Sequence, residues 1–190
     1  MKNQMLSPVG QVVKAIVMAI VDFPEEVELT ELKGERATVL EVSVRQSDHG
    51  KTVGRHGRLA GAMREILACH SGLENRTYVL EILEGERERS TTRSIFSTHP
   101  SHAEDAVLNT SVLLTTIVKG IVDDASSVHV HSVEGLQVVI FEVKAAPEDN
   151  RKIIGRGGRV ATAIRELLLS MGKKAGRRFI LELVEEKRRG

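Results

Sequence analysis

The chain has 190 residues, a formal net charge of +1 and 41% hydrophobic residues, which is typical of folded globular proteins and excludes an intrinsically disordered chain. The near-zero net charge neither supports nor excludes a polyanionic ligand, because such binding depends on where the charges lie. Cys69 is the single cysteine, which excludes an intrachain disulfide and favours a reducing compartment.

The first half of the chain predicts the element order α-β-β-α-α-β. A helix begins at Ser7-Pro8, carries apolar residues at 12, 13, 16, 17, 20 and 21, and is stopped by Pro24. Alternation at Val27, Leu29 and Leu32 predicts a strand that turns at 33–35. The remaining predicted elements are a strand through 39–44, a short helix over 48–53, a glycine break at 54–57, a helix from Arg58 to about His70 and a strand over 77–83.

The second half predicts the same order of elements. In sequence they are a helix ending near Asp123, strands over 128–133 and 136–145, a short helix with Pro147 at its start, a glycine break at 155–158, a helix over 159–170 and a strand over 178–184. The predicted fold class is therefore α+β, with each three-stranded sheet packed against helices.

The apolar run at 15–21 resembles a targeting signal or membrane anchor at first sight. It is too short to span a bilayer, and Asp22 and Pro24 follow at once. The same element recurs at 117–123, which a targeting signal would not do. We therefore interpret both runs as helices of the fold and expect a cytoplasmic protein without a membrane partner.

The two halves are copies of one unit. When the sequence is shifted by about 100 residues, it matches itself without a gap. Matched pairs include Ile16 with Ile117, Glu41 with Glu142, Asp48 with Asp149, Lys51 with Lys152, Glu65 with Glu166 and Arg76 with Arg177. The predicted organisation is a first domain over 8–84, a polar linker over 85–102, a second domain over 103–186 and a basic tail over 187–190.

Each unit carries one Gly-x-x-Gly loop, at 54–57 and at 155–158. A lone motif of this kind is weak evidence, since at the average glycine content of about 7% a chain of this length contains roughly one by chance. A plain turn between two helices is the alternative interpretation. The duplication at equivalent positions favours function, because both loops follow a lysine and an aliphatic residue and precede an arginine that begins a helix.

The loops suit a polyanion on physical grounds. Glycine allows a ligand to approach the backbone closely, and the N-terminus of the following helix favours phosphate. Basic residues cluster around both loops, while glutamates populate the first predicted strands. A nearly neutral chain can therefore present two basic surfaces.

The strings 50–58 (Gly-Lys-Thr-Val-Gly-Arg-His-Gly-Arg) and 151–159 (Arg-Lys-Ile-Ile-Gly-Arg-Gly-Gly-Arg) resemble the core of KH domains. With this element order, each unit is similar to a bacterial type II KH domain of the KhpA (YlqC) family, whose Val-Asp-x-Pro-Glu-x-Val run is echoed at 21–27. Thr52 and Arg151 depart from the family pattern.

The resemblance implies that each loop clamps the backbone of single-stranded RNA. The residues expected to bind RNA are Lys51, Val53, Gly54, Arg55, His56, Gly57 and Arg58 in the first unit, and Lys152, Ile154, Gly155, Arg156, Gly157, Gly158 and Arg159 in the second. The second loop is closer to the family pattern, so we expect it to be the stronger site.

Other functions have less support in the sequence. No nucleotide-binding, zinc-protease or serine-hydrolase motif is present, so we expect no catalysis and no cofactor. His129 and His131 share a strand face, but two candidate ligands without a third do not predict a metal site. One alternative is a protein-interaction module that forms a KH pseudo-dimer, self-associates or recruits another KH protein. Another is a ribosome- or transcription-associated factor resembling the paired KH units of NusA.

Overall fold

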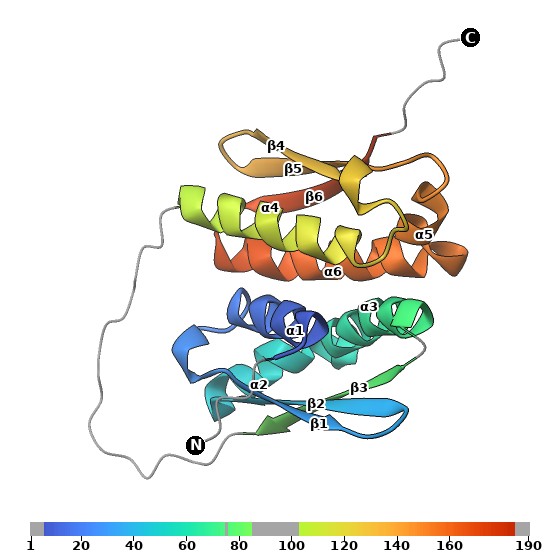
Figure 1. Ribbon diagram of the computed structural model, residues 1–190. Coiled ribbons are helices and arrows are strands. Elements are labelled where there is room, and N and C mark those ends of the chain that lie inside the picture. The colour runs from blue at the N-terminus through green and yellow to red at the C-terminus, as the bar shows by residue number, and fades with distance from the viewer. Residues whose placement is uncertain (1–5, 75, 85–102, 185–190) are drawn as a thin grey trace.

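The computed structural model describes residues 6–74, 76–84 and 103–184, and it contains two α+β units (Figure 1). The first unit consists of α1 (Pro8–Met18), β1 (Glu28–Lys33), β2 (Ala37–Val44), α2 (Gln46–Val53), α3 (Arg58–Glu74) and β3 (Thr77–Glu84). The second consists of α4 (Ala103–Lys119), β4 (His129–Glu134), β5 (Val138–Lys144), α5 (Asn150–Ile154), α6 (Arg159–Lys174) and β6 (Arg178–Leu183). The proposed linker, 85–102, and the basic tail, 187–190, lie outside the described residues.

Each unit has a three-stranded sheet with its second strand in the centre. In the first unit β2 pairs antiparallel with β1 and parallel with β3, and Leu40 lies between Glu31 and Leu80. The second sheet has the same order, β4-β5-β6. Because parallel strands need a crossover connection, the helices α2 and α3 must leave the sheet and return, which places the glycine loop between them.

The first helix of each unit is shorter than its apolar pattern predicts. The Ser7 hydroxyl accepts a hydrogen bond from the Gly10 amide at 3.1 Å, which caps the start of α1. The helix ends at Met18, although the following Ile20 and Val21 remain buried. In the second unit α4 likewise ends at Lys119 rather than near Asp123. No helix in the described part of the chain is long and apolar enough to cross a membrane.

In strand β1 the residues that face inward differ from the predicted alternation. Leu32 does not continue the inward face of Val27 and Leu29, because its side chain is 50% exposed and that of Glu31 is buried instead. The Glu31 carboxylate faces inward because it accepts hydrogen bonds from the backbone N–H and the hydroxyl of Ser7, at 2.9 and 2.6 Å. Residue 31 thus joins the sheet to the start of α1.

Other helix boundaries also differ from the prediction, including the start of α2 at Gln46 rather than residue 48. Helix α3 continues to Glu74 and α6 to Lys174, each past its predicted end. Helix α6 stops where Gly176 adopts a positive φ of 67°, a common way to end a helix. Helix α5 begins only at Asn150, so Pro147 lies in the preceding turn rather than at the helix start.

The two units pack against each other through their helices. In Figure 1 the sheets form the two outer layers, and the helices of both units lie between them. Arg58 on α3 pairs with Glu166 on α6, and Arg159 on α6 pairs with Glu65 on α3, each at 3.4 Å. The described residues form one continuous apolar core that includes both units. The duplicated units are therefore docked, which their sequences alone did not reveal.

Candidate nucleic-acid interface

The two glycine loops have the same backbone conformation. Gly54 and Gly155 share a φ of 75°, with ψ values of 167° and 169°. At the third loop position His56 has φ 56° and ψ 29°, and Gly157 has φ 65° and ψ 23°. The loops thus form matching sites even though one holds a histidine where the other holds a glycine.

The first glycine of each loop is required by both conformation and space. A Cβ on Gly54 would lie 2.6 Å from the Leu59 Cβ, and one on Gly155 would lie 2.4 Å from a methyl carbon of Val160. Their φ and ψ values also fall in a region that only glycine adopts readily. The backbone of each loop therefore lies close against the first turn of α3 or α6, where the helix dipole favours an anion.

Three loop side chains stand open to solvent. Arg55 and His56 of the first loop and Arg156 of the second are exposed. Within the described parts of the chain, none of the three makes a side-chain hydrogen bond or an ion pair. Both loops therefore present an arginine whose guanidinium can bind a phosphate through several N–H groups.

The predicted lysines are engaged inside their own units. Lys51 donates to the buried carboxylate of Asp48 at 3.1 Å and also pairs with Asp22. Lys152 pairs with Asp149 at 3.2 Å and with Asp123. The sequence placed these lysines around the phosphate site, but the structure gives each of them two acidic partners.

Asp48 and Asp149 connect the helix before each loop to the segment after α1 or α4. One Asp48 oxygen accepts the amides of Asp22 and Phe23, both at 3.0 Å. Asp149 accepts the amides of Asp123 and Asp124 at 3.1 and 3.0 Å. Each carboxylate side chain is only 1% exposed. Each therefore fixes the position of α2 or α5, and with it the start of the loop.

These hydrogen bonds outweigh the cost of burial. Burial by itself would raise the pKa of Asp48, but the amides of Phe23 and Asp22, together with Lys51, hold that pKa below its usual value. The pKa of Asp149 is lowered in the same way. Burial would lower the pKa of Lys51, yet hydrogen bonds to Asp22 and Asp48 raise it. Both partners therefore stay charged at neutral pH.

The two arginines that follow the loops face the other unit. Arg58 is 56% exposed while it pairs with Glu166, and Arg159 is 65% exposed while it pairs with Glu65. Exposed ion pairs of this kind contribute little stability, typically about 0–1 kcal/mol. Their guanidinium groups consequently remain accessible to a ligand that approaches the loops.

Aliphatic side chains flank the loops. Val53 is partly buried and Ile154 is 39% exposed, so both can contact a ligand. The preceding residues, Thr52 and Ile153, are fully buried. Thr52 fits this apolar position because its hydroxyl donates to the Asp48 carbonyl at 3.0 Å.

Comparison with known proteins assigns both units to one family. A model of the KH domain of KhpA/KhpB matches residues 10–82 and again residues 111–183. The chain belongs to the KhpA/KhpB KH-domain family. The match includes both glycine loops and leaves out the segment between the units.

Single-unit relatives match a little over a third of this KhpA/KhpB-family chain. RNA-binding protein KhpA of Borreliella burgdorferi is 43% identical over 74 residues, which cover 39% of this chain and 90% of the relative. KhpA of Caldanaerobacter subterraneus is 43% identical over 72 residues, covering 38% and 96%. KhpA of Aquifex aeolicus is 39% identical over 67 residues, covering 35% and 85%. The chain is thus a tandem duplication of a unit that those relatives carry once.

Four acidic residues shape the site of this KhpA/KhpB-family chain without having been predicted as part of it. Asp48 and Asp149 position the loops, and Glu65 and Glu166 pair with the arginines after them. Asp48 matches Asp149 and Glu65 matches Glu166 between the repeats, and this identity was the signal that the sequence offered. The backbone amides and arginines that they bind lie 25 or more positions away in the sequence, so spacing alone could not assign them these roles.

The remaining candidates contribute nothing to the loops. Among the described residues there is no group of three or more His, Cys, Asp or Glu side chains that could hold a metal ion, and His129 and His131 belong to no such group. Burial raises the pKa of the Cys69 thiol, which keeps it protonated at neutral pH. Phe179 is buried against Phe141 with ring centroids 5.1 Å apart, so it belongs to the core.

Proposed function

We propose that this chain is a non-catalytic RNA-binding protein that holds single-stranded RNA with its two GxxG loops. The observation that carries the proposal is the matched pair of loops, each with an exposed arginine at the N-terminus of a long helix. The KhpA relatives, which are named RNA-binding proteins, support it.

In this proposal the predicted residues have different roles. The loop glycines let the RNA backbone approach, Arg55, His56 and Arg156 contact phosphates, and Arg58 and Arg159 add positive charge nearby. Val53 and Ile154 provide apolar contact for bases. Lys51 and Lys152 act mainly by holding α2 and α5 in place, because both ammonium groups already have two carboxylate partners.

Loop substitutions test the proposal. A variant with Arg55→Asp, His56→Asp, Arg156→Asp and Gly157→Asp adds negative charge where phosphates would lie. Asp tolerates the left-handed conformation at residues 56 and 157, and no atom lies within 4 Å of a Cβ added to Gly157. We expect this variant to keep its circular dichroism spectrum and lose detectable binding to single-stranded RNA. Normal binding would contradict the proposal.

A matched control distinguishes the effect of charge at the loop from the effect of the protein's net charge. Arg36→Asp makes the same charge change as Arg55→Asp, but in the exposed turn between β1 and β2. We expect Arg36→Asp to leave RNA affinity within about twofold of the wild type. Arg55→Asp alone should lower it by roughly tenfold or more, in line with the roughly 1.5–3 kcal/mol typical of charged hydrogen bonds.

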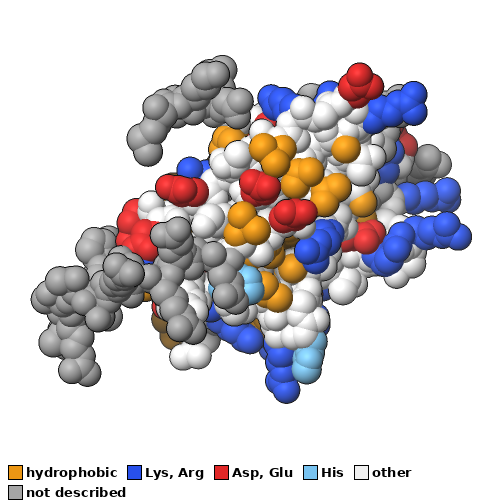
Figure 2. All heavy atoms as spheres, turned by 90° about the horizontal axis from the view of Figure 1, so that it is seen from below, with side chains coloured by type: hydrophobic (Ala, Val, Ile, Leu, Met, Phe, Trp, Pro, Cys, Tyr) orange, Lys and Arg blue, Asp and Glu red, His pale blue; other side chains and the backbone are white. Residues whose placement is uncertain are grey.

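One observation favours the alternative of a protein-interaction module. Figure 2 shows apolar side chains gathered on the outer face of the first sheet. Leu32, Val79 and Leu83 contribute to this face and are 50%, 41% and 42% exposed. A protein partner that is retained in pull-downs by the four-Asp variant, with no RNA co-purifying, would support this alternative, including association with a ribosome or transcription complex.

A further inference from the structure

The contacts between the units have the pattern of a twofold axis. The two repeats are offset by 101 positions, so Arg58 is equivalent to Arg159 and Glu65 is equivalent to Glu166. The same offset exchanges the two inter-unit ion pairs, Arg58–Glu166 and Arg159–Glu65, and both measure 3.4 Å. Reciprocal contacts of this kind define an isologous interface, here within one chain.

The axis makes α3 and α6 antiparallel. Each helix begins with the arginine that follows its loop, and each of these arginines reaches a glutamate seven positions into the other helix. In Figure 1, α2 and α5, which precede the two loops, accordingly lie towards opposite sides of the molecule. A rise of 1.5 Å per residue and a usual axis separation of 8–10 Å place the two helix N-termini roughly 14 Å apart.

This symmetry restricts the RNA that both loops can hold at once. An RNA strand has a chemical direction, and two units with the same fold bind it in the same direction relative to themselves. A half-turn about the axis reverses every direction perpendicular to it, so a strand that crosses the axis would run the wrong way for the second loop. A strand that runs parallel to the axis would miss the second loop, because the half-turn moves that loop to the other side of the axis. A straight strand therefore cannot continue in line from one loop into the other.

We propose that the paired loops select RNA whose strand turns back on itself, so that two single-stranded segments of opposite direction occupy the two loops. The inference rests on the proposed RNA binding and specifies its substrate class. Folded RNA with a loop or fork presents such segments side by side, whereas stretched RNA occupies one loop at a time.

A forked RNA and a rearranged control test the inference. Both contain the same short duplex and the same two single-stranded arms. In the fork both arms leave the same end of the duplex and run in opposite directions. In the control the arms leave opposite ends, so one chain cannot engage both. Each is titrated against the full-length protein by fluorescence anisotropy, alongside a duplex with one arm.

Simultaneous engagement should raise affinity through effective concentration. We expect the fork to bind about 100-fold more tightly than the one-armed duplex, and the control to bind like the one-armed duplex. Arg156→Asp with Gly157→Asp should reduce the fork to one-arm affinity. Equal affinity for fork and control would overturn the inference while leaving RNA binding intact. Failure of all three RNAs to bind would instead overturn the proposed function.

Discussion

The third position of each loop shows what a single residue contributes. His56 adopts the left-handed conformation that Gly157 adopts in the other unit. For a residue with a Cβ this conformation costs roughly 1–2 kcal/mol, so the first loop carries strain that the second lacks. The histidine adds a hydrogen-bonding ring at the place where a phosphate would lie. The two loops are therefore matched in shape but not in chemistry.

Gly54→Ala should destabilise the first unit by about 2–3 kcal/mol. The added methyl would meet Leu59 at 2.6 Å, and alanine resists both the φ of 75° and the ψ of 167°. Gly50→Ala is the control, since it lies in α2 with no atom within 4 Å of its added Cβ. It should be neutral or stabilise by up to about 1 kcal/mol. Urea unfolding measures both; equal effects would contradict the assigned loop geometry.

The loops depend on how their flanking helices are held. Helix α2 is joined to the end of the α1 region by Asp48, and α5 is joined to the end of the α4 region by Asp149. Removing such a carboxylate would leave buried amide donors without partners, which costs about 1–3 kcal/mol. The same side chain pairs with the lysine before the loop, so one residue fixes both the backbone and a neighbouring charge.

This connection predicts loss of stability in acid. The pKa values of Asp48 and Asp149 are lowered in the folded protein, so their contribution is present above the unfolded value of about 3.9. It is lost as the pH falls through the lowered values. Unfolding in urea between pH 7 and pH 2 should therefore show a steep decline below about pH 4.

Asp48→Asn with Asp149→Asn provides the comparison. Because asparagine does not titrate, this variant should be less stable than the wild type at pH 7 and should lose less stability between pH 4 and pH 2. If both proteins lost the same stability over this interval, other carboxylates would account for the acid response.

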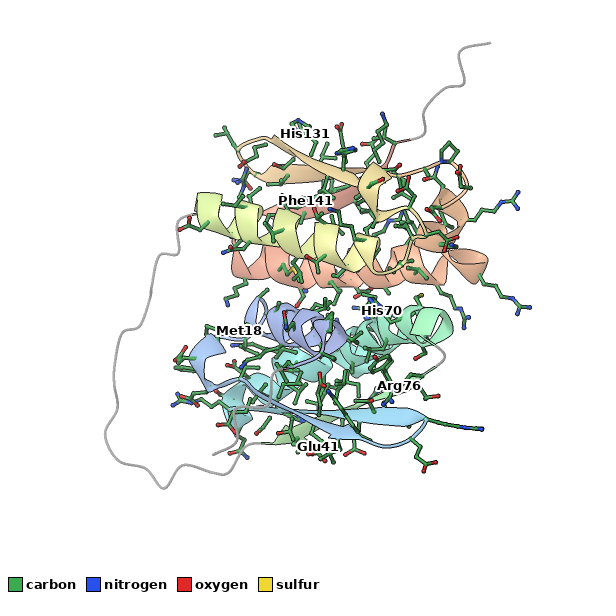
Figure 3. All side chains as sticks on the ribbon, in the orientation of Figure 1. Met18, Glu41, His70, Arg76, His131 and Phe141 are labelled. Atoms are coloured by element: carbon green, nitrogen blue, oxygen red, sulfur yellow. The ribbon has the colours of Figure 1, made fainter. Side chains whose placement is uncertain are left out.

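At the scale of the whole molecule, the docked helices determine where the loops lie. His70 on α3 is buried at the interface, where Figure 3 places it between the two units. Its Nδ1 lies 3.1 Å from the Ile66 carbonyl, and its Nε2 would be 2.2 Å from a Cβ added to Gly120 of the second unit. Lys174 also crosses the interface, donating to the Val21 carbonyl at 2.6 Å. The sheets, in contrast, face away from each other.

Gly120→Ala should therefore weaken docking, with a cost of about 1–3 kcal/mol from overpacking against His70. Gly61→Ala on α3 is the control, because no atom lies within 4 Å of its added Cβ. Adding His70→Met to Gly120→Ala recreates the residues at the equivalent positions, Met171 and Ala19, and should restore stability. Urea unfolding measures all three variants, and an unchanged Gly120→Ala protein would contradict this packing.

The order of the elements and the positions of the loops could be predicted from the sequence, but the residues that they contact from distant parts of the chain could not. Repeated periodicity predicted the element order, and the duplicated glycines identified both loops, because these signals are local. Lys51 was expected to bind RNA, and nothing local in the sequence reveals that Asp22, 29 positions earlier, lies beside it. The inward turn of Glu31 was missed for the same reason. Docking was also hidden, because apolar helix faces do not specify what they pack against.

Salt-dependent RNA binding tests the central claim most directly. The affinity of the wild type, Arg36→Asp and the four-Asp variant for one short single-stranded RNA would be measured over a series of salt concentrations. We predict that the logarithm of wild-type affinity falls with the logarithm of salt concentration, by about 0.7 for each phosphate contacted. Arg36→Asp should follow the wild type, and the four-Asp variant should bind too weakly to measure. Equal affinity and equal salt dependence of the wild type and the four-Asp variant would contradict the claim that the two loops bind RNA.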